Sequence, residues 1–115
     1  MKDISINIMG SNWEIIFQTK KENKQFSDLD GYTDYSVHKI YIRLFEKGEY
    51  DIEDLSAERR STLRHEIYHA FMGESGLRFN TNTVKSWATN EEMIDWLAIQ
   101  YPKIHKVFKQ LNIEN

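Results

Sequence analysis

Apolar and polar residues alternate near the start of the chain. Every second residue of 4–8 is isoleucine, and the residues between them are polar. A period of two places successive side chains on opposite faces of a strand, so the pattern predicts strands over 4–8 and 13–17. Residues 10–12, Gly-Ser-Asn, are turn formers, and we therefore expect a β-hairpin.

A polar stretch over 18–36 separates this hairpin from the next apolar segment. It predicts a solvated connection or a charged helix face, with a turn at Asp30-Gly31 near its end. Residues 37–45 then form the best strand pattern, because they are rich in β-branched and aromatic side chains. One face of that strand is expected to carry His38, Ile40, Ile42 and Leu44.

The clearest helical pattern covers residues 57–73 and follows an acidic connection over 46–55. Ser56 is a typical N-cap residue, and the glycines at 73 and 76 favour the end of a helix. Apolar residues of this helix fall in one arc and are expected to face the core. They are Leu63, Ile67, Ala70 and Phe71.

The C-terminal third predicts a loop and two more helices. Residues 74–89 are expected to form the loop, with Trp87 as a packing anchor, and Asn90 is suited to cap a helix over 91–101. Pro102 has no backbone N–H, so we expect it to end this helix and begin the next. Helically spaced apolar residues of the last helix predict core contacts: Ile104, Val107, Phe108 and Leu111.

Together these elements predict an α+β fold. A small, mostly antiparallel sheet is expected to pack on one central helix and two C-terminal helices. The 115 residues suit a single domain over 1–115. Hydrophobic residues make up 40% and charged residues 29% of the chain, which is typical of a globular protein.

Charge and cysteine content narrow the classes of partner and site. The formal net charge of -3 argues against nucleic acid as the main partner, since phosphate binding needs a basic surface. The chain has no cysteine, so disulfides and thiolate metal sites are excluded, and any metal must be held by His, Asp or Glu. Residues 1–16 contain no continuous apolar run, so we expect neither a signal peptide nor a membrane anchor, and a cytoplasmic location by default.

The segment His65-Glu66-Ile67-Tyr68-His69 has the H-E-x-x-H pattern. Residues four apart lie one above the other on a helix, so His65 and His69 can bind one metal ion. Glu66 is rotated about 100° from His65, which directs it to a water beside the metal rather than to the metal itself. The pattern therefore predicts a zinc site with Glu66 as general base.

Chance can also produce this pattern, in roughly one such chain in eighty. The alternative interpretation is two surface histidines beside an unrelated glutamate. The position of the motif on a predicted amphipathic helix favours the metal site.

A third protein ligand is expected from the helix that begins at residue 91. Glu91 and Asp95 are four residues apart and share a helix face. Glu91 can bind the metal while Asp95 accepts a hydrogen bond from the other ring nitrogen of a ligating histidine. Glu92 is the substitute ligand, and both glutamates also suit a helix N-terminus without any metal.

These motifs resemble the gluzincin class of zinc peptidases. The segments HEIYHAFMGESGL and NEEMIDWLAIQYPKI are also similar to small phage and mobile-element proteins related to the ImmA/IrrE-type metallopeptidases. The resemblance covers about residues 31–104. It implies one zinc ion per chain, Glu91 as the third ligand, Asp95 as the support of a histidine, and a zincin-like fold.

The chain also departs from related patterns. Proteins of the ImmA/IrrE type usually carry asparagine where this chain has Asp95, and no helix-turn-helix accompanies the motif. A metzincin site is excluded, because Met72 and Ser75 occupy the positions of its glycine and its third histidine.

Amide hydrolysis also needs a donor to the developing oxyanion. The candidates are His38 and Tyr101, with Tyr32 and Tyr35 as further options. In the peptidases that the chain resembles, the strand before the active-site helix pairs with an extended substrate. The resemblance implies this role for residues 37–43, through β-augmentation.

The favoured function is a zinc-dependent peptidase, with a bacterial or phage protein as the substrate that the resemblance implies. One alternative is a non-catalytic, zinc-stabilised interaction module. Another is a metal-dependent amidase that acts on cell-wall or other small amides. Histidine and carboxylate ligands also suit manganese, iron, cobalt and nickel.

Overall fold

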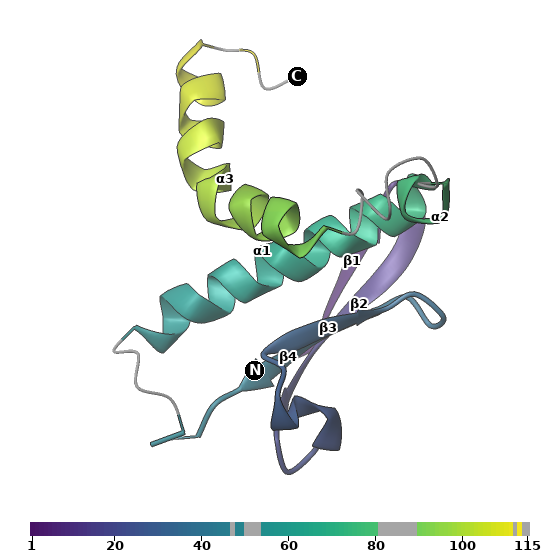
Figure 1. The fold of residues 1–115 in the computed structure, drawn as a ribbon, viewed down its shortest axis with the longest axis vertical. Coiled ribbons are helices and arrows are strands. Elements are labelled where there is room, and N and C mark those ends of the chain that lie inside the picture. The colour runs from purple at the N-terminus through teal and green to yellow at the C-terminus, as the bar shows by residue number, and fades with distance from the viewer. Residues whose placement is uncertain (47, 50–53, 81–89, 112, 114–115) are drawn as a thin grey trace.

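The computed structural model describes residues 1–46, 48–49, 54–80, 90–111 and 113. Its sheet has the strand order β1-β2-β4-β3 (Figure 1). The strands are β1 (Ile4–Ile8), β2 (Ser11–Thr19), β3 (Gly31–Asp34) and β4 (Lys39–Leu44). The helices are the 3-10 turn η1 (Lys24–Ser27), α1 (Leu55–Glu74), α2 (Leu77–Asn80) and α3 (Glu91–Leu111).

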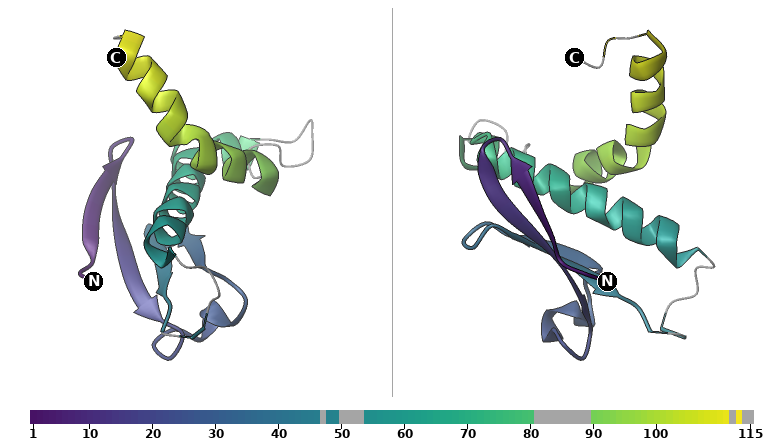
Figure 2. Two further views of the ribbon diagram at one scale, coloured as in Figure 1. Left: turned by 90° about the vertical axis from the view of Figure 1, so that its left-hand side faces the viewer. Right: turned by 180° about the vertical axis from the view of Figure 1, so that it is seen from behind.

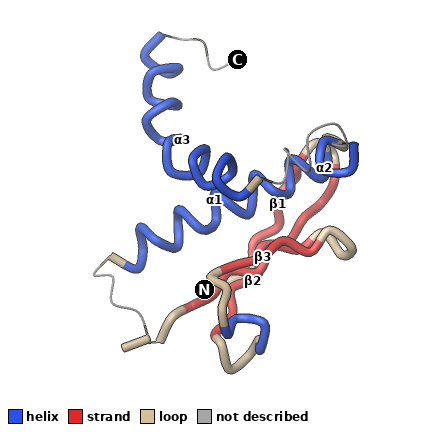
Figure 3. The backbone as a smooth tube through the Cα atoms, in the orientation of Figure 1, coloured by secondary structure: helices blue, strands red, loops and turns tan. Residues whose placement is uncertain are grey.

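The sheet and the helices form three successive layers. Helix α1 packs on one face of the sheet, mainly against β3 and β4, and α3 packs on the other side of α1 (Figure 2). The α+β class predicted from the sequence is confirmed. The sheet is mixed, because β2 and β4 are parallel, whereas β1 pairs with β2 and β3 with β4 in antiparallel fashion. Two of its three pairings are antiparallel, which agrees with the expected mostly antiparallel sheet. Figure 3 distinguishes the strands from the helices by colour.

The predicted N-terminal hairpin is present, but its turn lies earlier than expected. Ile8 pairs with Ser11, so Met9 and Gly10 form a two-residue turn, and both have positive φ, at 52° and 96°. This is the type I′ geometry, which matches the twist of the flanking strands and suits glycine at its second position. The prediction of residues 10–12 as the turn is therefore wrong by one to two residues.

The polar segment 18–36 contains more structure than its composition indicated. Strand β2 continues to Thr19, the η1 turn follows, and β3 begins at Gly31. Strand β4 is shorter than the predicted 37–45, because residues 35–38 form the turn between β3 and β4. His38 has φ 55° in this turn and so does not lie on a strand face.

The core lies between the sheet and α1. Side chains that alternate along β2 and β4 are buried there, and Ala70 of α1 is fully buried against them. Leu63 and Ile67 pack at the margin of this core, as predicted, but Phe71 is 42% exposed, so its predicted core position is wrong. The buried strand residues are Ile8, Trp13, Ile15, Phe17, Ile40 and Ile42.

Helix α1 begins earlier than predicted. Its N-cap is Asp54, whose side chain accepts a hydrogen bond from the Ala57 N–H at 2.9 Å, and not Ser56. The helix ends at Glu74, with Gly76 at φ 84° just beyond it, as the glycine signal predicted. Gly73 lies inside the helix, where a Cβ would approach the Tyr35 ring to 2.5 Å.

Helix α3 is continuous, although two helices were predicted on either side of Pro102. Asn90 is the predicted cap, because its side chain accepts a hydrogen bond from the Met93 N–H at 2.9 Å. Pro102 leaves the Ala98 carbonyl without its usual helical donor. Arg64 of α1 replaces that donor, with its Nε 2.5 Å from the Ala98 oxygen.

The bend in α3 directs its C-terminal half away from the sheet (Figure 1). This explains why Leu111 is 61% exposed rather than in the core as predicted, while Ile104 is partly buried. The expectations for the Val107 and Phe108 side chains and for Trp87 concern parts of the chain outside the described structure. Among the described residues, no helix combines the length and apolar character needed to cross a membrane.

Candidate metal centre

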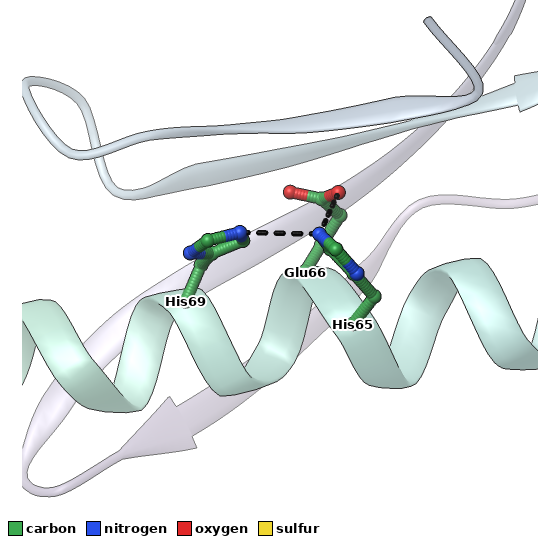
Figure 4. A group of neighbouring side chains, drawn as sticks. All are labelled: His65, Glu66 and His69. Atoms are coloured by element: carbon green, nitrogen blue, oxygen red, sulfur yellow. Dashed lines mark hydrogen bonds and ion pairs between the residues drawn. The ribbon is translucent and has the colours of Figure 1, made fainter. Parts of the chain in front are cut away.

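His65 and His69 project from the same face of α1 toward one point (Figure 4). Their Nε2 atoms are 3.1 Å apart, and the two rings lie edge to face. Two ligands at zinc distance in a tetrahedral site are separated by roughly 3.4 Å. The helical spacing thus brings both nitrogens to a separation that suits one metal ion.

Glu91 lies at the start of α3, where that helix crosses α1. Its two carboxylate oxygens are 2.9 Å from His65 Nε2 and 3.0 Å from His69 Nε2. Glu92 is exposed and does not line the pocket around the histidines. Of the two glutamates considered as third ligand, the geometry favours Glu91.

His65, Glu66 and His69 also form a compact group, with potential ligand atoms within 4.8 Å of one another. Glu66 is the less suitable metal ligand, because its Oε2 lies 3.8 Å from His65 Nε2 and its Oε1 accepts a hydrogen bond from Thr33. Glu91 contacts both histidines and carries no such competing bond among the described residues. The contacts therefore suit Glu91 better than Glu66 as a third donor beside the two histidines.

Asp95 fixes the orientation of His65 from one turn further along α3. Its Oδ1 lies 2.5 Å from His65 Nδ1. When His65 donates its Nδ1–H to this carboxylate, Nε2 carries no proton and its lone pair points toward Glu91 and His69. This is the tautomer that a metal requires. The structure thus brings Asp95 to the position predicted for it from the sequence.

His69 differs from His65, because no described carboxylate orients its ring through Nδ1. Its Nδ1 is buried and has no hydrogen-bond partner in the described part of the chain. Burial lowers the pKa of His69, although the Glu91 carboxylate opposes this effect. A neutral imidazole is the form that binds metal through Nε2, so the environment of His69 fits a ligand.

Glu66 is buried between α1 and the edge strand β3, with 6% of its surface exposed. Burial raises the pKa of its carboxyl, and the hydrogen bond from Thr33 Oγ1 at 2.9 Å acts in the opposite direction. Gly31 allows β3 to lie this close to α1, because a Cβ at this position would lie 2.9 Å from Thr62 Cγ2 and 3.3 Å from Glu66 Cγ. Neither Thr33 nor the strand that carries it was predicted from the sequence.

These residues line a pocket of about 600 Å³ between β3, α1 and the start of α3. Tyr32, Tyr35 and Arg78 are also in its wall, whereas His38 and Tyr101 are not. His38 stacks on Trp13 at a centroid distance of 4.9 Å, and Tyr101 stacks on His105 at 5.3 Å. The structure therefore separates the two main oxyanion candidates from the site.

The hydroxyl groups of the two tyrosines in the pocket wall already form hydrogen bonds within the protein. Tyr32 Oη lies 2.7 Å from Asn23 Nδ2, and its ring stacks on Tyr41. Tyr35 donates its hydroxyl proton to the His69 carbonyl oxygen at 3.2 Å. Arg78, which sequence periodicity did not single out, contacts Tyr35 through its guanidinium.

Comparison with known proteins finds no family model, no curated protein and no solved structure that matches this chain. The assignment of a function therefore depends on the geometry of the site and on the residues themselves.

Proposed function

We propose that this chain is a zinc-dependent peptidase of the gluzincin type. The convergence of His65, His69 and Glu91 on one point carries the proposal, because two imidazole nitrogens and a carboxylate leave a fourth position open. A zinc ion held by these three residues would supply Lewis acidity for a carbonyl group and a water molecule. The donor set fits zinc, since burial lowers the pKa of His69, which favours its neutral form, and His65 is oriented by Asp95.

Glu66 is the proposed general base. Its carboxylate lies next to the ligand group but is held back from it by Thr33. Burial raises the pKa of its carboxyl, which makes the carboxylate a stronger base. Glu66 takes a proton from the attacking water and later gives it to the leaving amine.

The proposed substrate is an extended peptide that pairs with β3. The expectation that residues 37–43 pair with substrate is wrong, because β4 is hydrogen-bonded to β2 on one side and to β3 on the other. Strand β3 is an edge strand of the sheet, and its residues Gly31, Tyr32 and Thr33 line the pocket. Its outer edge, which no described strand covers, can accept a peptide by β-augmentation.

The zincin-like character of the fold is part of the same proposal. A sheet that backs the H-E-x-x-H helix and a following helix that supplies a glutamate support it. A bacterial or phage protein as the substrate is a proposal from the sequence resemblance alone.

Metal content and hydrolysis of a defined peptide panel test this function together. We expect about one zinc per chain, with loss of zinc in His69→Ala and Glu91→Ala. Glu92→Ala is the matched control and should retain zinc, because Glu92 lies next to the site in sequence but outside the pocket. Glu66→Gln should keep zinc and lose hydrolysis by at least about a hundredfold.

Other results would redirect the assignment. A chain that takes up no zinc, even after incubation with it, contradicts the proposal. Zinc binding with no cleavage by wild type favours the zinc-stabilised interaction module, in which Glu66→Gln changes nothing. Cleavage of small amides but not of internal peptide bonds favours the amidase.

A further inference from the structure

Arg78 lies on α2, beside the last turns of α1, and its side chain is held against Tyr35. The guanidinium carbon is 4.1 Å from the centre of the Tyr35 ring, and Nη1 donates to the Tyr35 hydroxyl at 3.3 Å. Tyr35 donates its single proton to the His69 carbonyl oxygen. The tyrosine therefore positions Arg78 relative to the helix that carries the proposed metal ligands.

The described wall of the pocket is otherwise rich in carboxyl groups. Arg78 is the only lysine or arginine among its described lining residues. Apart from the proposed zinc ion, which also attracts anions, Arg78 is therefore the described part of this wall with a fixed positive charge, and the carboxyl groups away from the metal repel an anionic ligand. The carboxyl residues are Asp28, Asp30, Glu58, Glu66, Glu91 and Asp95.

A guanidinium stacked on an aromatic ring suits recognition of a carboxylate. Its planar N–H groups match the two oxygens of a carboxylate, and the contact with Tyr35 fixes the side chain before a ligand arrives. Less side-chain entropy is lost on binding when the side chain is already ordered. The position in the pocket wall brings this group within reach of a peptide on β3.

We propose that Arg78 recognises a carboxylate of the peptide substrate, near the bond that faces Glu66. This inference rests on the proposed peptidase function and names the class of substrate that the pocket selects. The carboxylate comes from an acidic side chain or from the free C-terminus of the peptide.

The direction of the peptide decides between these two sources. Strand β3 runs from Gly31 beside Thr62 toward Tyr35 beside Gly73 and His69. A peptide antiparallel to β3 brings the residues before the scissile bond to Arg78, where only a side chain can supply the carboxylate. A parallel peptide brings the residues after that bond, where the C-terminal carboxylate can also bind.

Calorimetric titration of zinc-loaded Glu66→Gln protein with uncleaved peptides tests the inference. Four hexapeptides share one apolar sequence: a neutral peptide with blocked ends, two with glutamate in the N- or C-terminal half, and one with a free C-terminus. We expect at least one carboxylate peptide to bind about tenfold or more tightly than the neutral peptide. Adding Arg78→Gln should abolish the difference and leave the affinity for the neutral peptide within about twofold.

Two further variants separate recognition from net charge and from folding. Lys103→Gln removes one positive charge from the exposed part of α3, outside the pocket, and should keep the preference. Arg78→Lys keeps the charge but loses the planar fork, and should retain only part of the preference. Far-UV circular dichroism and zinc content verify that the Arg78 variants remain folded.

Absence of any carboxylate preference with Arg78 intact, or its survival in Arg78→Gln, overturns the inference. Failure of all four peptides to bind also overturns it. Wild-type hydrolysis is measured separately. Hydrolysis without the preference retains the peptidase and rejects this role of Arg78, whereas the preference without hydrolysis retains Arg78 and rejects the peptidase.

Discussion

At the scale of single residues, atoms outside the H-E-x-x-H segment hold the candidate site in place. Asp95 orients His65, and Thr33 orients Glu66 from the opposite side of the pocket. Thr33 Oγ1 also lies 3.1 Å from the Glu66 carbonyl oxygen, but its one proton can serve only one acceptor at a time. The charged carboxylate is the stronger acceptor, so we assign the proton to it.

Thr33→Val tests this positioning role. The substitution keeps the shape of the side chain but removes the only described hydrogen bond to a Glu66 carboxylate oxygen, so we expect kcat to fall about tenfold with unchanged zinc content. Thr33→Ser retains the hydroxyl and should keep most of the activity. A valine variant with wild-type kcat would show that Thr33 does not position the base.

The sequence predicted part of this arrangement for a simple reason. His65 with His69, and Glu91 with Asp95, are pairs four residues apart, and such pairs face one direction on any helix. Arg78 follows a helix end and is placed by its contact with Tyr35, which comes from a turn far away in the sequence. No local period marks a contact of that kind.

At the scale of elements, α3 shows how a neighbouring helix can offset a proline. Pro102 cannot donate to the Ala98 carbonyl, and the Arg64 guanidinium of α1 occupies that position instead. The two predicted helices therefore form one bent helix. The same contact joins α3 to α1 about one turn beyond Asp95 and two turns beyond Glu91 in α3.

A double-mutant cycle measures this compensation. Arg64→Met removes the donor and keeps the aliphatic stem, so we expect it to lower the free energy of unfolding by about 1–2 kcal/mol. In a Pro102→Ala background the backbone N–H can return to the Ala98 carbonyl, and the cost of Arg64→Met should shrink. Urea unfolding of the four proteins provides the comparison, and equal costs in both backgrounds would contradict the explanation.

Strand β3 is an element that the sequence pattern did not predict. Tyr32 and Thr33 favour strands, but the four residues lie in a long polar segment that resembles a loop. Pairing with β4 and packing of α1 against Gly31 stabilise it in the structure. An edge strand of this length is defined by its partners more than by its own pattern.

At the scale of the whole molecule, Glu74 links the end of α1 to the N-terminal hairpin. Its carboxylate accepts hydrogen bonds from Trp13 Nε1 at 2.8 Å and Ser11 Oγ at 2.9 Å, and His38 Nε2 lies 3.6 Å away. The bond from Trp13, then that from Ser11, lowers the pKa of Glu74 below its ordinary value of 4.5. Because the pKa is lower in the folded state, the contribution of this group to stability is present above about pH 4.5 and lost as the pH falls below it.

Glu74→Gln is therefore expected to destabilise the protein at pH 7 and to differ less from wild type at pH 3. Urea unfolding at both pH values measures the difference. Glu14→Gln is the matched control, because Glu14 is exposed on strand β2, and it should have little effect at either pH. A Glu74→Gln effect of equal size at both pH values would show that the charge of Glu74 does not stabilise the fold.

The sequence by itself determined the features that repeat over short distances. They include the N-terminal hairpin, the core strand at Ile40 and Ile42, the H-E-x-x-H helix and the cap at Asn90. Each depends on hydrogen bonds or side-chain periods within a few residues, which local sequence encodes.

Tertiary structure alone decided the features that join distant segments. The parallel pairing of β2 with β4 made β3 the edge of the sheet, and the crossing of α1 by α3 brought Glu91 to the histidines. The continuity of α3 through Pro102 depended on Arg64 in the same way. These outcomes depend on packing between elements remote in sequence, for which the order of residues along the chain gives no local signal.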